Sequence, residues 1–492
     1  MSLSMVNAAT GCPSCRPRTS FGHDVLKLVS GTALAQILTV LAMPLLTRLY
    51  APEPFGTLVL FISLSSVISL ISCMGYELAI MLPETDEQAA NVLGVSLGFV
   101  TIVSVLTVPF VWWSRASLSQ WFDAPGLTSY LWLMPPTVFI TGIFLALSCW
   151  NVRSRRFSRL SVARISQSLA ALSTQLGGGY AGVANGGMLI GGHIAGQATA
   201  TAVLAGQIWR DDRTLIWRSL QLRVMLSAIR RYRRFPLYGS WSALLNTVSW
   251  QTPALLLSAF FSPIVAGCYA LGFRILQMPM SLIGSAIAQV FFQRAADARS
   301  QGTVGHLTEA VFRRLVLISL FPMLTLAIVG RDLYIVAFGS RWAEAGHYTQ
   351  ILSVWALFWF ISSPLQDLTS ALEKQRFAAV WNLGLLITRV LSIVVGGLLG
   401  NVYLALTLFS VTGILMYGFL FTAQLSWVGV PWRRTLRILL SCCFMALPLL
   451  GVVAAAKILV SDPWAVLAAA ALMFLLYAVQ VVRQGVLTEV PA

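Results

Sequence analysis

The stretch PLLTRLYAPEPFG, Pro44 to Gly56, marks the point where one apolar helix is expected to end and the next to begin. An apolar run that starts at Val25 leads into it, and a second run, Leu58 to Cys73, follows it. Each run approaches the roughly 20 residues that a helix needs to cross a bilayer. Pro52 and Pro54 forbid one continuous helix, because proline lacks the N–H donor and clashes with the preceding turn. The stretch therefore predicts two successive membrane helices.

A similar pattern of prolines followed by glycine recurs in PALLLSAFFSPIVAG, residues 253–267. Pro52 and Gly56 have counterparts 211 residues later in Pro263 and Gly267. A second pair of similar segments is RRFSRLSVAR, which starts at Arg155, and KQRFAAVWNL, which starts at Lys374. Phe157 and Phe377, which correspond in these segments, are 220 residues apart. These spacings predict two related halves laid end to end, which is a common plan among transporters.

Composition indicates a polytopic membrane protein and excludes a soluble enzyme: 57% of residues are hydrophobic, 10% are charged and the mean hydropathy is +0.79. Fourteen hydrophobic segments start near residues 25, 55, 89, 128, 159, 186, 236, 264, 311, 347, 378, 402, 437 and 463. The predicted fold is all-α, with about 14 transmembrane helices in two six-helix lobes related by the repeat, plus two C-terminal helices. The expected parts are an N-terminal tail (1–24), a first lobe of helices 1–6 (25–209), a basic linker (210–235), a second lobe of helices 7–12 (236–427), helices 13–14 (436–484) and a C-terminal tail (485–492).

The lysines and arginines divide unequally between the two sides of this arrangement. Of the 33, 26 fall on the side of the two termini, five fall in the opposite loops, and Arg274 and Arg389 fall inside helices. The positive-inside rule then predicts that both termini are cytoplasmic. This topology accounts for the net charge of +16 without nucleic-acid binding. The basic linker is open to two interpretations: a solvated connection, or an amphipathic helix on anionic headgroups.

Polar residues inside membrane helices are costly and usually functional. Five of them follow at spacings of 3, 4, 4 and 4 on one face of the eighth helix: Arg274, Gln277, Ser281, Ser285 and Gln289. Such a stripe suits a water-filled cavity. Arginine is a sensible residue for that cavity if the cargo carries phosphate, because the planar guanidinium group binds phosphate oxygens bidentately. The alternative is that Arg274 forms an ion pair that locks helices together.

Further candidates come from other helices. Arg48, Arg389, Asn246 and Gln175 join Arg274 and Gln277 as predicted substrate-binding residues of a central cavity. Glu77, Asp367, His193 and Arg164 are predicted to serve gating or ion coupling, although each also fits an ion pair, a helix cap or a satisfied polar residue. Coupling to H⁺ or to Na⁺ stays open.

Enzyme signatures are missing: the sequence has no phosphate-binding P-loop, no zinc-spaced His/Cys cluster and no dinucleotide fingerprint. The four histidines are scattered at positions 23, 193, 306 and 347. No catalytic residue, cofactor or metal is therefore expected, and the chain is predicted to be a transporter.

Two blocks carry a family resemblance. LTRLYAPEPFGTLVLFIS, followed by GYELAIMLPETDEQAANVLGVS (Gly75 to Ser96), resembles the opening of Wzx-type polysaccharide flippases of the multidrug/oligosaccharidyl-lipid/polysaccharide exporter superfamily. FGSRWAEAGHYTQILSVWALFWFISSPLQDLTSAL (Phe338 to Leu372) resembles their later signature. Together with the helix count, the resemblance covers nearly the whole chain after residue 24.

The resemblance implies a flippase that moves undecaprenyl-pyrophosphate-linked oligosaccharide repeat units across the bacterial inner membrane by alternating access, for export of O-antigen or exopolysaccharide. It implies the lipid-linked oligosaccharide and the bilayer as partners, with a polysaccharide polymerase and a chain-length regulator as further candidates. Two alternatives remain. A cation-coupled drug or small-molecule antiporter of the same superfamily should prefer acidic cavity residues, and a membrane polysaccharide polymerase or ligase needs a large extracytoplasmic loop that is not visible here.

Overall fold

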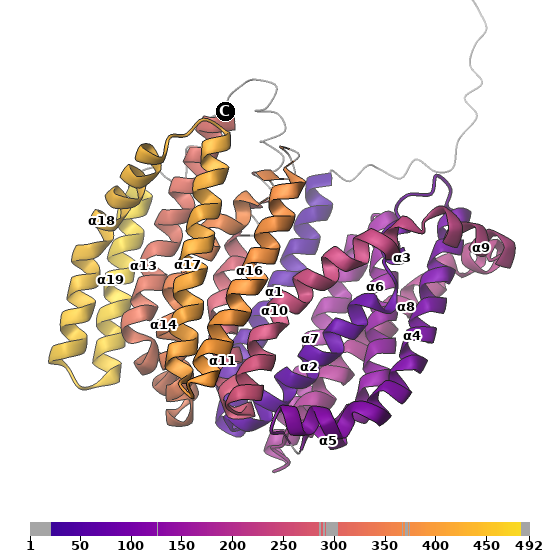
Figure 1. Cartoon of the computed structure of the whole chain (residues 1–492), viewed down its shortest axis with the longest axis horizontal. Helices are drawn as coiled ribbons and strands as arrows, with labels where there is room; N and C mark the ends of the chain where they lie inside the picture. The colour runs from indigo at the N-terminus through magenta and orange to yellow at the C-terminus, as the bar shows by residue number, and fades with distance from the viewer. Residues whose placement is uncertain are drawn as a thin grey trace, which may run out of the picture.

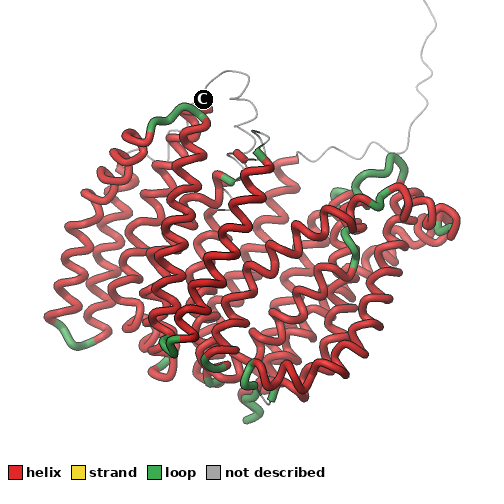
Figure 2. Tube along the Cα trace, in the orientation of Figure 1, coloured by secondary structure: helices red, strands yellow, loops and turns green. Residues whose placement is uncertain are grey.

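The computed structural model describes residues 21–124, 126–284, 287–288, 291, 304–366, 368–369, 372 and 374–483. Within these ranges, every regular element is a helix, and the long helices form two groups that are tilted relative to one another (Figures 1 and 2). The predicted all-α membrane fold is confirmed.

In the described part of the chain, ten stretches are long and apolar enough to cross a membrane. These stretches correspond to all or most of α1 (Phe21–Leu49), α2 (Pro52–Ser72), α4 (Asp86–Trp121), α6 (Met134–Arg153), α8 (Gly186–Ser219), α13 (Val304–Phe338), α16 (Gln375–Leu398), α17 (Val402–Trp427), α18 (Trp432–Leu459) and α19 (Pro463–Arg483). Four more helices of 17 to 24 residues lie among them: α7 (Phe157–Tyr180), α10 (Ser240–Phe260), α11 (Pro263–Pro279) and α14 (Ala343–Ser362). The described residues thus form the expected fourteen long helices.

Short elements connect the long helices. They are α3 (Tyr76–Ala79), α5 (Leu127–Tyr130), α9 (Leu222–Arg231), the 3₁₀ turns η1 (Leu131–Leu133), η4 (Ser340–Trp342) and η5 (Ser363–Leu365), and the π turns η2 (Phe235–Gly239) and η3 (Met280–Gly284). The segment 210–235, expected as one linker, is largely helical, because α8 continues to Ser219 and α9 follows.

The helix boundaries follow from local chemistry. Pro52 and Pro263, the two prolines of the repeat, both open helices, where a missing N–H costs nothing. The hydroxyl of Ser262 accepts a hydrogen bond from the N–H of Val265 and so caps α11. The side chain of Asn185 caps α8 in the same way. These signals explain why the starts predicted near residues 55, 186 and 264 agree closely with those of α2, α8 and α11, whereas α13 begins at Val304, ahead of the start predicted near 311.

The long helices pack as two six-helix bundles. The first bundle holds α1, α2, α4, α6, α7 and α8, and the second holds α10, α11, α13, α14, α16 and α17, with α18 and α19 packed on α13. Helix α2 contacts α10 and α11, which joins the two bundles. The end at which α6, α8 and α17 finish, uppermost in Figure 1, is called the basic end here; the end at which α1 finishes and α2 starts is called the opposite end.

Candidate functional site

A cavity of about 510 Å³ lies between the two bundles, enclosed by α1, α2, α7 and α11. Its polar lining residues are Thr32, Gln36, Thr39, Arg164, Gln167, Ser168, Arg274, Gln277 and Ser281. Apolar side chains, including Met43, Phe55 and Phe273, complete the wall. The volume is in the usual range for a site that binds a small molecule or a headgroup.

The α11 stripe supplies the polar wall of the second bundle. Arg274, Gln277 and Ser281 all line the cavity, and the side chains of Arg274 and Gln277 are exposed. Helix α11 ends at Pro279, and the π turn η3 carries Ser281. Ser285 and Gln289, the last two residues of the predicted stripe, lie outside the described residues.

Arg164 supplies a second positive charge, from α7 of the first bundle. Its guanidinium group lies 4.9 Å from the ring centroid of Phe144, and one of its nitrogens is 3.5 Å from Oε1 of Gln167. The amide of Gln167 donates in turn to Oε1 of Gln197 on α8, at 2.6 Å. The side chain of Arg164 therefore lies along the cavity wall, beside Phe144 and Gln167.

The cavity is strongly basic. No acidic residue is among its lining residues in the described part of the chain, and none of the ion pairs found there involves Arg164 or Arg274. His193 on α8 interacts electrostatically with Arg274, but a histidine is neutral or positive and so does not neutralise the arginine. Two guanidinium groups without a carboxylate partner favour an anionic ligand.

A side chain of the second bundle closes the cavity at the opposite end. Trp342 in η4 is fully buried, and its indole N–H donates to the carbonyl oxygen of Thr47 on α1 at 2.9 Å. The ring of Trp342 meets the cavity residue Phe55 edge to face, with ring centroids 5.0 Å apart. The cavity residues Arg164 and Ser281 lie toward the basic end. In this conformation the site is therefore closed at the opposite end.

Arg389 lies away from this cavity. It is only 3% exposed, and it donates to the carbonyl and hydroxyl oxygens of Ser249, at 3.2 and 3.0 Å, and to the hydroxyl oxygen of Tyr417, at 3.3 Å. Its guanidinium group stacks 4.2 Å from the ring centroid of Trp250. The structure thus gives Arg389 a set of partners that join α10, α16 and α17, and substrate binding by Arg389 stays a prediction.

The other predicted substrate-binding residues also lie outside the cavity lining. Arg48 is exposed at the end of α1, and Asn246 is exposed on α10. Gln175 is buried: its side-chain amide donates to the carbonyl oxygen of Leu189 at 3.0 Å, and its main-chain carbonyl oxygen accepts from the hydroxyl of Tyr50 at 2.7 Å. Of the six predicted binding residues, this conformation brings together Arg274 and Gln277, joined by the predicted gating residue Arg164.

Of the remaining predicted gating residues, Glu77 is buried in α3, and Asp367 lies outside the described residues. One carboxyl oxygen of Glu77 has no hydrogen-bond partner among the described residues. Burial raises the pKa of Glu77, while main-chain N–H groups at Glu77 and Gly75 act in the other direction. A role for Glu77 or Asp367 in ion coupling stays a prediction.

Sequence reasoning missed the contribution of α1 to the site. Thr32, Gln36 and Thr39 line the cavity, and Oε1 of Gln36 is buried without a partner among the described residues. Their spacings of 4 and 3 place them on one helical face. This polar face within an otherwise apolar run could have been used to predict that α1 lines a cavity. The described residues contain no cluster of His, Cys, Asp and Glu that could hold a metal ion.

Comparisons with known proteins agree with this architecture. A family model described as polysaccharide biosynthesis protein matches residues 45–347. The fold is similar to that of the lipid II flippase MurJ in an inward closed conformation, with a TM-score of 0.73 and 12% identity over 93% of this chain and 99% of that one. It is also similar to an inward-facing multidrug resistance MATE family transporter of the MOP superfamily, with a TM-score of 0.65 and 14% identity over 80% of this chain and 95% of that one. Comparison with curated proteins found no match.

Proposed function

The chain belongs to the polysaccharide biosynthesis protein family, and from that premise we propose that it is a flippase for lipid-linked oligosaccharides. The proposed substrate is an oligosaccharide repeat unit on undecaprenyl pyrophosphate. The proposed mechanism is alternating access, in which the two bundles rock about the cavity. In this proposal the protein is a transporter without a catalytic residue.

One observation carries the proposal: Arg164 and Arg274 face a single cavity between the bundles, and no carboxylate of the described residues pairs with either. A charge held at membrane depth without a partner is costly, so a ligand that supplies the opposite charge stabilises the site. Pyrophosphate matches the planar guanidinium fork, because its oxygens accept two parallel hydrogen bonds. Gln36, Gln167 and Gln277 add amide groups suited to sugar hydroxyls.

The proposed setting is the bacterial inner membrane, with both termini in the cytoplasm as the arginine distribution predicts. In that orientation the basic end faces the cytoplasm and the end closed by Trp342 faces outward. The cavity would then receive its substrate from the cytoplasmic side. A polymerase and a chain-length regulator are proposed partners for the exported O-antigen or exopolysaccharide.

A cation-coupled antiporter for drugs or small molecules is the second candidate, since a multidrug transporter shares the fold. A cavity that binds organic cations needs negative charge, whereas the described lining holds two arginines and no acid. The charge of the preferred ligand therefore discriminates between the two functions.

The test is ligand binding to the purified chain in detergent. Undecaprenyl pyrophosphate that carries a short glycan should bind, the neutral free glycan should bind poorly, and a lipophilic cation should not compete. Arg274→Ala should weaken lipid-linked binding by at least about tenfold, because a hydrogen bond to a charged group contributes roughly 1.5–3 kcal/mol. Arg274→Lys should restore part of it, because lysine keeps the charge without the fork.

Arg115→Ala is the matched control, since Arg115 contacts the rings of Trp112 and Trp132 and lies outside the cavity. Equal binding of free and lipid-linked glycan would refute the role of the pyrophosphate. Competition by the cation would favour the antiporter instead.

A further inference from the structure

A strongly basic segment, Trp209 to Arg234, connects the two bundles at the basic end and is called the basic arm here. It carries eight arginines, all exposed: Arg210, Arg213, Arg218, Arg223, Arg230, Arg231, Arg233 and Arg234. Its acidic residues are Asp211 and Asp212. The cavity described above uses none of these residues.

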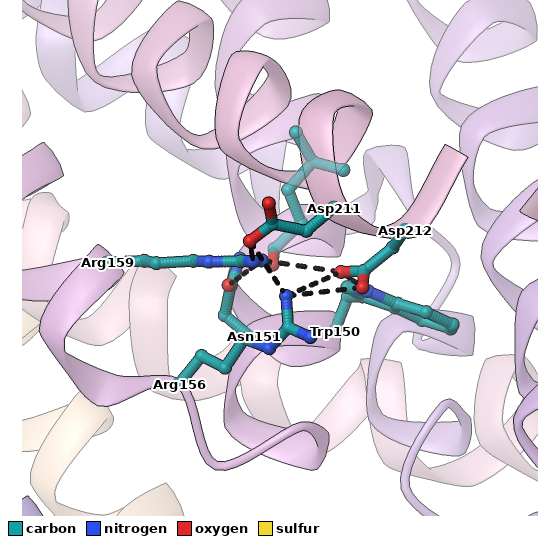
Figure 3. Close-up of polar contacts among 7 residues, drawn as sticks. Trp150, Asn151, Arg156, Arg159, Asp211 and Asp212 are labelled. Carbon is teal, nitrogen blue, oxygen red and sulfur yellow. Dashed lines mark hydrogen bonds and ion pairs between the residues drawn. The ribbon is translucent and has the colours of Figure 1, made fainter. Parts of the chain in front are cut away.

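Both aspartates of the basic arm are engaged by Arg156, which directly precedes α7, and by Arg159 within it (Figure 3). The guanidinium group of Arg156 lies 3.2 Å from a carboxylate oxygen of each aspartate. Arg159 also pairs with both, and its distance to Asp212 is 3.3 Å. The indole N–H of Trp150 donates to Asp212 at 3.3 Å. Both carboxylates are thus neutralised by arginines outside the arm, and no ion pair among the described residues involves the arm's own arginines.

Specific contacts fix the path of the arm over α4. The amide of Asn91 donates to the carbonyl of Ser219 at 2.7 Å, and its oxygen accepts from the N–H of Gln221 at 2.9 Å. A Cβ at Gly94 would lie 2.8 Å from Leu220 and 3.0 Å from Met225, so both side chains cover this glycine. Helix α9 therefore lies against the side of α4 near its start, and Figure 1 shows it crossing there at the edge of the first bundle.

The two faces of α9 differ in chemistry. Met225, Ala228 and Ile229 pack inward on the cluster formed with α4. The outer face carries Leu222, which is 72% exposed, and Leu226 one turn later. At 100° per residue, Arg230 and Arg223 lie on one side of these leucines, about 40–60° beyond Leu226, and Arg231 lies about 80° further round the helix.

Two exposed tryptophans extend this surface along the end of α8. Trp209 and Trp217 meet edge to face with ring centroids 6.4 Å apart. Helix α8 has 34 residues and is about 51 Å long at 1.5 Å per residue, whereas the hydrocarbon core is roughly 30 Å thick. Its last turns therefore reach into the interfacial layer, where tryptophan is enriched.

We propose that the basic arm is a docking surface for anionic phospholipid, with Leu222 and Leu226 in the acyl boundary and Arg223, Arg230 and Arg231 on the headgroup phosphates. A solvated linker gives no reason for leucine and tryptophan side chains to be exposed beside uncompensated arginines. Amphipathic helices that lie in the membrane interface combine these two features. A nucleic acid would use the arginines but not the leucines.

The test uses the purified full-length chain in mixed micelles that contain equal amounts of phosphatidylglycerol and phosphatidylcholine with identical acyl chains. Native mass spectrometry counts the lipids retained. The wild type should retain phosphatidylglycerol preferentially. The triple variant Arg223→Gln/Arg230→Gln/Arg231→Gln should lose at least about tenfold of that preference, because one basic residue at an anionic surface contributes roughly fivefold. These side chains are exposed, so the variant should fold normally.

The matched control removes the same charge from exposed arginines of the second bundle and of α18, as Arg376→Gln/Arg433→Gln/Arg437→Gln. It should keep the preference of the wild type. An unchanged preference in the first triple variant, or an equal loss in the control, would overturn the proposal. Leu222→Gln/Leu226→Gln should also weaken retention, and inorganic phosphate should not displace the lipid. Displacement by phosphate alone would indicate a simple anion site and would contradict docking of a lipid.

Discussion

Gly56 of α2 lies directly against the carbonyl oxygen of Pro263 at the start of α11: a Cβ at position 56 would lie 1.8 Å from that oxygen. The reciprocal contact is also present, since a Cβ on Gly267 would lie 2.2 Å from the carbonyl oxygen of Pro52. Both pairs of equivalent residues are 211 positions apart in the chain. Because each half offers the same two residues to the other, the contact has local two-fold symmetry. The equivalent residues of the two sequence repeats thus contact each other at the junction of the two bundles.

The junction should not tolerate a side chain. Gly56→Ala should push α2 and α11 apart and lower the free energy of unfolding by about 1–3 kcal/mol, as expected for overpacking against rigid backbone. Thermal unfolding of the purified chain measures the change. Gly98→Ala in α4 is the matched control, because no atom lies within 4 Å of its added Cβ. Gly98→Ala should leave stability unchanged or raise it by up to roughly 1 kcal/mol. Equal stability of both variants would show that the close approach is not maintained in the membrane protein.

The prediction of helices succeeded because proline and capping residues act locally. Pro52 and Pro263 end one helix and start the next wherever they occur, so the sequence located these turns without knowledge of the fold. Helix α9 was less visible, because only its docking on Gly94 distinguishes an ordered amphipathic helix from a solvated basic linker.

The candidate site was harder to predict, because the sequence indicates how deep a residue lies in the membrane but not which neighbouring helix or cavity its side chain faces. Arg274 and Arg389 both lie inside helices, yet Arg274 faces the cavity and Arg389 is enclosed by Ser249, Tyr417 and Trp250. Helical periodicity reports the face on which each arginine lies, but which neighbour covers that face depends on packing between distant helices. Trp342 was missed for the same reason, since its acceptor, Thr47, lies 295 residues away.

The enclosure of Arg389 predicts a structural effect of its removal. Arg389→Gln breaks charged hydrogen bonds to Ser249 and Tyr417 and the contact with Trp250, so unfolding should become easier by about 2–4 kcal/mol. Arg274→Gln should change stability little and binding strongly, because the Arg274 side chain is exposed in the cavity. Thermal unfolding and lipid-linked glycan binding, measured on both variants, separate the two roles. A stable Arg389→Gln protein that no longer binds substrate would instead place Arg389 on the transport path.

Burial of Glu77 predicts a pH dependence of stability. Burial raises the pKa of this carboxyl above its ordinary value of 4.5, so the folded protein favours the protonated form. At a pH below 4.5, Glu77 is protonated in both the folded and the unfolded state, and the folded state keeps its full stability. As the pH rises from there to the raised pKa, the unfolded chain ionises first and the folded state loses stability. Glu77→Gln cannot ionise, so its advantage over the wild type should grow across this interval and then level off.

Thermal unfolding between pH 4 and pH 9 measures this effect, with Glu84→Gln as the control, because Glu84 is exposed in the same connection between α2 and α4. The control should follow the wild type at every pH. A constant difference between the Glu77→Gln protein and the wild type would mean that Glu77 is ionised throughout the range.

The hydrogen bond from Trp342 to Thr47 is expected to help keep the opposite end closed. Trp342→Phe keeps an aromatic ring against Phe55 but loses the N–H that donates to Thr47. One buried hydrogen bond contributes about 0.5–1.5 kcal/mol, so the equilibrium should shift toward opening at this end by roughly two- to tenfold. Spin labels at Tyr180→Cys and Leu399→Cys, two exposed positions at the opposite end on different bundles, report their separation once the seven native cysteines are replaced.

The labelled Trp342→Phe protein should populate a longer distance more often than its parent. Trp132→Phe is the matched control, because Trp132 also lies at the opposite end but contacts Trp112 and Arg115 within the first bundle. It should leave the distance distribution unchanged. The lost hydrogen bond joins η4 to α1, so only its removal frees the second bundle from the first. If both variants open alike, loss of aromatic packing is sufficient; if neither opens, the Gly56–Pro263 junction alone holds the bundles together and Trp342 is no gate.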